Sequence, residues 1–234
     1  MEQLVFELAV PEPPGFGNFL PGRNGELLAI LPRFAAGALD ETGILLWGGA
    51  AAGKSHLLAA TVAHAVGLGH PARLLAHPAE VDPAAEVAAN MLVAIDRIDE
   101  ADELAAGRIF TLYNVLKATR GRLVAAARAP LTALPLREDL RTRLGWGLVY
   151  EVLPLADAEK PAALAAYARE RGFTLSDEVI EYLLRHGRRD MRSLLATLAA
   201  LDRRSLAAKR PITVPLLKQW LQRELEWERP SRNA

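Results

Sequence analysis

The chain has 234 residues, enough for one large domain or two small ones. Its 28 basic and 28 acidic side chains give a formal net charge of zero. This argues against a protein that mainly coats nucleic acid, because neutralising phosphates requires an excess of cations. The absence of cysteine excludes disulfide scaffolds, cysteine-ligated zinc, iron–sulfur clusters and cysteine nucleophiles, and it fits a reducing compartment.

Neither the N-terminus nor any uncharged stretch predicts export or membrane insertion. Residues 1–15 carry carboxylates and no basic residue, unlike the start of a secretory signal. The longest uncharged stretch, Ser55–Ala72, contains three histidines and two glycines, which makes it a poor membrane span. We therefore expect a soluble cytoplasmic protein that does not bind membranes.

The first 15 residues predict an extended arm. An apolar-containing segment, Gln3-Leu4-Val5-Phe6-Glu7-Leu8, precedes a cluster of prolines that cannot be helical and should act as a linker. Residues 24–38 follow with apolar side chains at helical spacing, and Pro32 predicts a kink in that helix.

Short apolar runs then alternate with helical patterns. We expect strands over residues 44–47, 72–76, 91–95, 123–127 and 148–153, and helices over 54–66 and 109–119. Strands separated by helices of this length predict an α/β fold, a parallel sheet with helices on both faces.

The pattern changes after Pro154. Four helical stretches, at residues 157–171, 176–186, 190–208 and 214–228, follow one another with no strand between them. The sequence therefore predicts three parts: an arm and linker at 1–15, an α/β domain at 16–156, and a small all-helical domain at 157–234.

The strongest motif is the run Gly48-Gly49-Ala50-Ala51-Ala52-Gly53-Lys54-Ser55. It fits G-x-x-x-x-G-K-S directly after a predicted strand and before a predicted helix, the context of a phosphate-binding loop. Glycines let successive backbone N–H groups face one centre, Lys54 supplies a charge to the outer phosphates, and the Ser55 hydroxyl can ligate Mg²⁺. The alternative is a glycine-rich turn with a solvated lysine.

A second carboxylate completes this candidate site. Asp96 ends the apolar run 91–95, where it can position the metal ion beside the phosphate loop, although it could also only cap a turn. The next residue is Arg97, which cannot act as a base, and Asp99 lies three positions on. Hydrolysis of ATP by this chain alone is therefore in doubt.

Several segments resemble the AAA+ ATPases, and among them the branch of the bacterial replication initiator DnaA. They are Asn18–Gly22, Gly53–Leu58, Ile95–Asp99, Ile109–Asn114, Arg143–Gly147 and Arg189–Arg192. The segment Arg143-Leu144-Gly145-Trp146-Gly147 and the helix with Tyr113-Asn114 are more specific than the phosphate loop. Within that branch the chain is most similar to the Hda family of DnaA homologues, which inactivate the initiator, and we expect no DNA-binding domain after the last helix. The resemblance covers essentially the whole chain and implies a AAA+ domain followed by a helical lid.

The resemblance also implies roles for individual residues. Residues 48–55 together with His56, and Arg192 in the lid, would bind ADP or ATP, while Ser55 and Asp96 would hold Mg²⁺. Arg143 would act catalytically as an arginine finger on the γ-phosphate of ATP bound by a neighbouring subunit, and Asp96 would act at the metal of this chain's own site. Alternatively, Arg143 is a helix-end arginine paired with Glu138 or Asp139, and Arg192 is an exposed helix-start residue.

The N-terminal arm and the AAA+-like part of the chain together imply partner proteins. Residues Gln3, Leu4, Phe6 and Leu8 are similar to the peptide that docks on the bacterial sliding clamp, the β subunit of DNA polymerase III, or they form a stray apolar arm. The resemblance implies a negative regulator of replication initiation that meets DnaA and reaches DNA mainly through the clamp, and that could form a homo-oligomer. Two alternatives are a self-contained AAA+ ATPase in a clamp loader or helicase loader, and a binding adaptor without nucleotide chemistry.

Overall fold

The computed structural model describes residues 13–188, 190–208 and 210–227. These residues form two compact units, Pro14–Leu155 and the residues from Ala156 onward. The first unit contains a five-stranded parallel sheet in the order β2-β3-β4-β1-β5. Its strands are β1 (Gly43–Trp47), β2 (Ala72–Leu75), β3 (Leu92–Ile95), β4 (Arg122–Ala127) and β5 (Leu148–Glu151). The predicted parallel sheet is confirmed, and each strand begins and ends within two residues of its predicted range.

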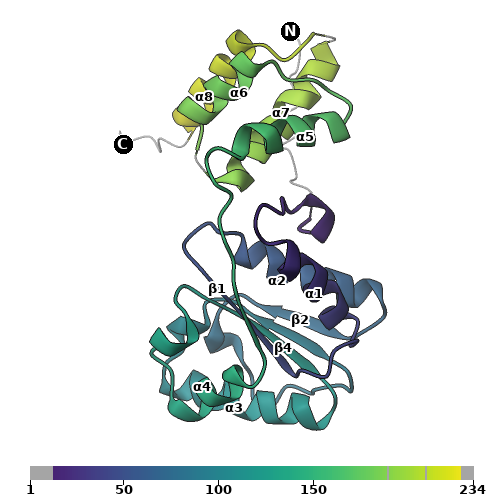
Figure 1. Cartoon of the computed structure of the whole chain (residues 1–234), viewed down its shortest axis with the longest axis vertical. Helices are drawn as coiled ribbons and strands as arrows, with labels where there is room; N and C mark the ends of the chain where they lie inside the picture. Colours follow the sequence, from purple (N-terminus) through teal and green to yellow (C-terminus); the bar gives the residue numbers. More distant parts are fainter. Residues whose placement is uncertain (1–12, 189, 209, 228–234) are drawn as a thin grey trace, which may run out of the picture. The chain divides into compact units, whose positions relative to one another are not determined.

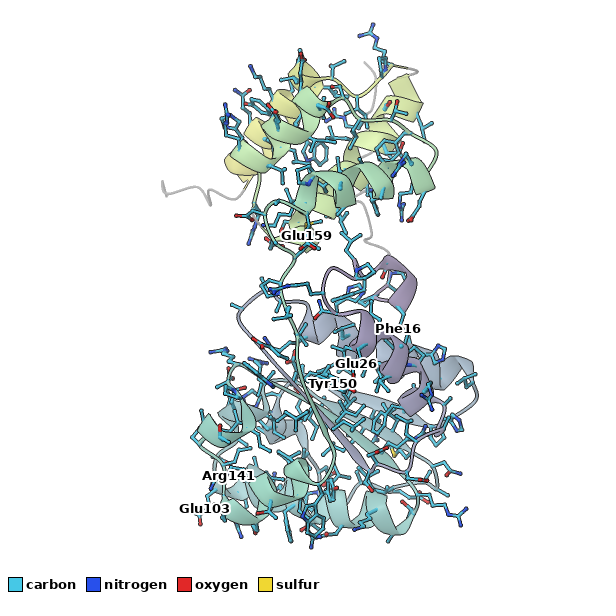
Figure 2. The ribbon with its side chains drawn as sticks, viewed as in Figure 1. Phe16, Glu26, Glu103, Arg141, Tyr150 and Glu159 are labelled. Carbon is cyan, nitrogen blue, oxygen red and sulfur yellow. The ribbon has the colours of Figure 1, made fainter. Side chains whose placement is uncertain are left out.

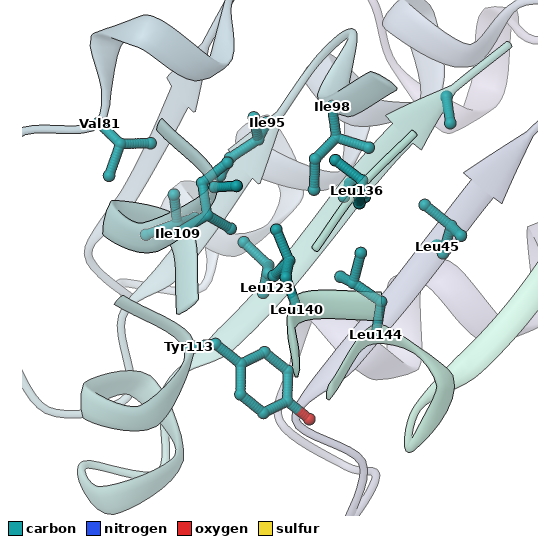
Figure 3. Close-up of a cluster of buried hydrophobic side chains, with 14 of the residues drawn as sticks. Leu45, Val81, Ile95, Ile98, Ile109, Tyr113, Leu123, Leu136, Leu140 and Leu144 are labelled. Atoms are coloured by element: carbon teal, nitrogen blue, oxygen red, sulfur yellow. The ribbon is translucent and has the colours of Figure 1, made fainter. Parts of the chain in front are cut away.

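Helices cover both faces of the sheet, as predicted. α1 (Gly25–Ala35) and α2 (Lys54–Gly67) lie on one face, and α3 (Glu103–Ala118) and α4 (Glu138–Gly145) lie on the other (Figure 1). Because successive strand residues point to opposite faces, Leu45 packs in the core beneath α3 and α4, whereas its neighbours Ile44 and Leu46 pack beneath α1 and α2. Figure 3 shows the α3–α4 core, in which the side chains of both helices meet those of the central strands.

Two helices differ from the expectation. α3 begins at Glu103, six residues before the predicted start, because the Asp102 carboxylate accepts a hydrogen bond from the Ala105 backbone N–H at 2.7 Å and caps the helix. α4, which is short and rich in arginine, was not among the helices expected from the apolar pattern, although Arg143 was considered as a helix-end residue. Single turns of 3-10 helix complete the unit: η1 (Phe16–Asn18), η2 (Pro78–Glu80), η3 (Ile98–Glu100) and η4 (Leu131–Ala133).

Arg122 is a buried cation between α1 and the sheet. It is 3% exposed, and its guanidinium donates to the backbone carbonyls of Phe34 and Ala35 at the end of α1 and to that of Asn90. Burial lowers the pKa of Arg122. The carbonyls at a helix C-terminus carry partial negative charge, so this arginine joins α1 to β4 without a carboxylate partner among these contacts.

The second unit is all-helical, as predicted. It consists of α5 (Lys160–Glu170), α6 (Asp177–His186), α7 (Met191–Ala208) and α8 (Val214–Trp227). One face of each helix contributes to a single apolar core, which includes Leu164, Leu183, Leu198, Leu201 and Leu217. The unit therefore has its own hydrophobic core.

Candidate functional site

The candidate phosphate loop lies at the carboxyl end of β1 and leads into α2. Two of its glycines are required by close packing: a Cβ on Gly48 would lie 2.5 Å from the Val152 carbonyl oxygen, and a Cβ on Gly53, whose φ is +102°, would lie 2.6 Å from the Phe19 ring. Gly53 immediately precedes α2, so the N–H groups of the first turn of α2 face the loop. This is the geometry that binds anions at a helix N-terminus.

Lys54 is the first residue of α2 and folds back over the loop. Its Nζ donates to the carbonyl oxygens of Gly48 and Gly49, both at 2.7 Å. Burial lowers the pKa of Lys54, while the nearby charges of Asp96 and Asp99 act to raise it. An ammonium group held at the centre of such a loop is placed to meet a phosphate.

Ser55 and Asp96 are brought together from α2 and the end of β3. The Ser55 hydroxyl donates to Asp96 Oδ2 at 2.5 Å, and Asp96 Oδ1 accepts the backbone N–H of Arg97 at 2.8 Å. A hydroxyl and a carboxylate beside a phosphate loop fit Mg²⁺, which prefers oxygen ligands and completes its shell with water and phosphate oxygens. No cluster of three or more acidic, histidine or cysteine side chains that could hold a metal by itself occurs within residues 13–188, 190–208 and 210–227.

The side chain of Arg97, the residue after Asp96, is bonded to the backbone at the end of β2. Arg97 has a left-handed backbone, with φ of +52°, and its Nε and Nη2 both donate to the Ala76 carbonyl at the end of β2, at 3.1 and 2.8 Å. Asp99 Oδ1 accepts the backbone N–H of Arg128 at 3.2 Å. The position next to Asp96 therefore supplies no acid, as the sequence indicated.

The segment before α1 closes over the start of α2. The His56 ring lies 5.5 Å from that of Phe19, and His56 Nε2 lies 2.9 Å from the Gly15 carbonyl oxygen. Asn24 was not singled out from the sequence, yet it is buried and its side chain both donates to the Leu153 carbonyl and accepts the Leu153 N–H, each at 2.8 Å. The only sequence signal at Asn24 was its position directly before a helix. That signal does not predict a hydrogen-bond partner 129 residues away.

A hydrogen bond also joins the first turn of α1 to β5. The Tyr150 hydroxyl donates to Glu26 at 3.0 Å, and Figure 2 labels both residues, which lie in the same part of the α/β unit. Burial together with this hydrogen bond raises the pKa of Tyr150. Residues 15–26 are therefore held to β5 and to the start of α2, next to the phosphate loop.

Arg143 lies at the other end of the sheet. It occupies the last turn of α4, and its guanidinium stacks 4.1 Å from the centre of the Trp146 ring and 5.4 Å from that of Phe110. Gly147, a few residues further on, packs against Gly43 at the amino end of β1, where a Cβ on Gly147 would lie 2.0 Å from the Gly43 carbonyl oxygen. Arg143 and the phosphate loop are therefore separated by the length of β1, roughly 16 Å.

Among the ion pairs of the described residues, neither Glu138 nor Asp139 is paired with Arg143. Glu138 pairs with Arg141, and Asp139 pairs with Arg137 at 2.8 Å. Arg141 lies at the opposite end of the α/β unit from Phe16, the residue that begins η1 (Figure 2).

Arg192 is the second residue of α7 in the helical unit. The helix starts at an Asp190 carboxylate that accepts the Ser193 N–H at 2.9 Å. Although partial burial of Asp190 opposes ionisation, this bond and the charge of Arg188 lower its pKa. Gln3, Leu4, Phe6 and Leu8 lie outside the described residues. None of the helices within the described residues has the length and apolar character needed to span a membrane.

Comparison with solved structures shows the fold. AMPPCP-bound DnaA from Aquifex aeolicus is 18% identical, with a TM-score of 0.65 over 81% of this chain and 64% of that one. Domain III of Thermotoga maritima DnaA is 14% identical, with a TM-score of 0.66 over 89% and 95%. A single-residue variant of T. maritima RuvB is 16% identical, with a TM-score of 0.65 over 90% and 72%. These likenesses place the chain in the AAA+ fold but do not separate an initiator from RuvB.

The helical unit matches a more specific family model, which distinguishes between these two kinds of protein. Residues 157–221 match the family described as the Hda lid domain. The helical unit is therefore similar to the lid domain of the Hda family, and the α/β unit has the fold of DnaA. The expected AAA+ fold followed by a helical lid is thereby confirmed.

Proposed function

We propose that this protein is a negative regulator of chromosome replication that promotes hydrolysis of the ATP bound to the initiator DnaA. Its parts would be a clamp-binding arm at 1–15, a nucleotide-binding domain at 16–156 and a lid at 157–234. The observation that carries the proposal is the position of Arg143, at the opposite end of the sheet from the chain's own phosphate loop, in a chain with an Hda lid.

Arg143 would act on a nucleotide held by another protein. A guanidinium stays charged and presents forked donors that match phosphate oxygens. Such a finger stabilises charge on the transferred phosphoryl group and can contribute about 10³–10⁵ in rate. Because β1 separates Arg143 from Gly48, the γ-phosphate that it meets would belong to DnaA.

The chain's own loop would hold ADP or ATP. Residues 48–53 lead into α2, and Lys54, Ser55 and His56 form its first turn. Together they would bind the nucleotide. Lys54 would meet the phosphates, and Ser55 with Asp96 would hold Mg²⁺, which neutralises phosphate charge when it is bound. Arg192 would contact the nucleotide from the lid. Solved DnaA structures with this fold contain the ATP analogue AMPPCP, which supports the assignment. With Arg97 after Asp96, intrinsic ATPase activity would be weak.

The arm would bring the protein to its target. In an extended segment Leu4, Phe6 and Leu8 share one face and can enter an apolar groove of the sliding clamp, while Gln3 adds hydrogen bonds. A clamp loaded on DNA would then raise the local concentration of this cytoplasmic protein near DnaA. Contact with DNA would be mainly indirect.

A reconstituted assay tests the proposal. ATP-loaded DnaA is incubated with this protein, with and without clamp loaded on DNA, and the ADP-bound fraction of DnaA is followed in time. We expect conversion to ADP only when the protein and the loaded clamp are both present. ATP turnover by this protein alone, at a rate unaffected by DnaA, would instead favour the self-contained loader ATPase.

A further inference from the structure

The exposed ring of Trp146 carries two cationic side chains. The Arg143 guanidinium lies 4.1 Å from the centre of this ring, and Lys117 Nζ lies 4.9 Å from it. The two positive groups are therefore no more than about 9 Å apart, because both contact the same ring. We refer to Lys117, Arg143 and Trp146 as the Trp146 patch.

The ends of two helices build this patch. Lys117 lies in the last turn of α3, Arg143 lies in the last turn of α4, and Trp146 is the C-cap residue of α4. The unpaired carbonyls at a helix C-terminus carry partial negative charge, which favours a basic side chain there. The chain after Trp146 is fixed because Gly147 packs closely against Gly43 of β1. The patch is therefore built on rigid elements of the α/β unit.

No carboxylate forms an ion pair with the patch in the part of the chain that the structure describes. The two acidic residues of α4 pair with other arginines, Arg137 and Arg141. The remaining ion pairs of the described residues include neither Lys117 nor Arg143. Two cations this close repel each other, so an anionic surface that approaches them is attracted and relieves the repulsion.

The two cations suit different anions. Arg143 presents forked donors that match phosphate oxygens, whereas the ammonium of Lys117 is a compact point charge on a flexible stem. Lys117 is exposed, and an ammonium group carries three N–H donors. It can therefore stay over the ring and still donate to a carboxylate of a partner protein. Charges of this kind at an interface mainly affect encounter and affinity.

We infer that Lys117 is a docking residue that binds a carboxylate on the surface of DnaA, while Arg143 beside it acts on the nucleotide. The inference rests on the proposed function and adds to it a second residue and the acidic chemistry of the surface that this residue recognises. Because Trp146 contacts both cations, docking through Lys117 brings Arg143 to a defined place. Lys117 then governs affinity for DnaA, and Arg143 governs turnover.

The test measures hydrolysis of DnaA-bound ATP by a fixed amount of this protein on clamp-loaded DNA, with ATP-loaded DnaA as the varied species. The DnaA concentration that gives half the maximal rate reports docking, and the maximal rate reports the finger. Lys117→Glu should raise this concentration about tenfold or more, because attraction becomes repulsion, and change the maximal rate by less than about twofold. Lys117→Arg keeps the charge and should stay within about twofold of wild type in both.

Lys218→Glu is the matched control. Lys218 also lies over an aromatic ring, that of Tyr182 at 5.2 Å, but it belongs to the helical unit, so the same charge reversal should change neither quantity by more than about twofold. Added salt should weaken docking of the wild type and narrow its difference from Lys117→Glu, since salt screens exposed charges. Thermal melting and capture by the clamp verify that each variant is folded and loaded.

The outcomes separate this inference from the proposed function. If Lys117→Glu has the half-maximal concentration of wild type, the docking role is wrong and the finger stands. A loss of maximal rate at an unchanged half-maximal concentration would place Lys117 on the nucleotide and also overturn the docking role. A wild-type protein that stimulates no hydrolysis at any DnaA concentration would overturn the proposed function and this inference together.

Discussion

The guanidinium of Arg143 stacks 4.1 Å from the ring centre of Trp146, three residues further along the chain. Trp146 is 54% exposed, and Lys117 approaches the same ring at 4.9 Å. An exposed tryptophan that carries two cations is not needed for the core. It can instead hold the extended arginine side chain in one orientation before a partner arrives.

Replacing Trp146 should therefore affect the finger rather than the fold. Trp146→Ala should lower the maximal rate of stimulated DnaA hydrolysis about two- to fivefold, since an exposed cation–π contact contributes about 0.5–1 kcal/mol. Trp146→Phe should retain most of the rate. The rate is measured at saturating protein, so that a change in affinity for DnaA is separated from a change in turnover. Equal rates for wild type and Trp146→Ala would contradict a positioning role.

Lys54 should be required for nucleotide binding. Lys54→Ala removes the ammonium group from the loop centre and should weaken ADP and ATP binding by about two orders of magnitude, measured by calorimetry with Mg²⁺. Lys117→Ala is the control, because this lysine lies at Trp146 rather than at the loop, and it should leave both affinities unchanged. Retention of wild-type affinity in Lys54→Ala would show that residues 48–55 form only a turn.

Arg122 should contribute to stability. Arg122→Met leaves the buried carbonyls of Phe34, Ala35 and Asn90 without their donors and should lower the free energy of unfolding by about 2–4 kcal/mol. Urea titration of the intact chain measures this. Arg33→Ala, an exposed substitution on α1, should change the unfolding free energy by no more than about 0.5 kcal/mol. Similar stability of the two variants would mean that water replaces the lost donors.

The arm should bind the clamp without stabilising the domains. The described hydrophobic cores are built from residue 16 onward, so deletion of residues 1–9 should move the thermal midpoint by less than about 2 °C. The same deletion should abolish capture of the protein by immobilised clamp. The double variant Leu4→Ala, Phe6→Ala should do likewise, and clamp capture that survives it would place the binding site elsewhere.

The sequence predicted the local parts of the site well. The candidate phosphate loop could be singled out because its glycines, Lys54 and Ser55 are contiguous and follow an apolar run. Asp96 was found because it ends such a run, and the structure joins it to Ser55 by a hydrogen bond. Each of these signals lies within a few residues of the group it identifies.

The long-range parts could not be predicted from such signals. The strand order, the Asn24 bonds to Leu153 and the contacts of Arg122 depend on residues up to 129 positions apart. α4 was missed because its charged residues and short length give little periodicity. The Arg128–Glu100 pair is likewise visible only once β3 and β4 lie side by side.

The central claim is that Arg143 acts in trans on ATP bound to DnaA. Its closest control is Arg141, two residues earlier on α4 and paired with Glu138, because both substitutions remove an arginine from the same helix.

The most direct measurement is the rate at which ATP-loaded DnaA is converted to its ADP form in the presence of clamp loaded on DNA. Wild type and Arg141→Ala should stimulate this conversion equally. Arg143→Ala should bind nucleotide and clamp normally but lose about 10³-fold or more of the stimulation. Stimulation by Arg143→Ala equal to that of wild type would contradict the account and assign Arg143 a structural role on Trp146.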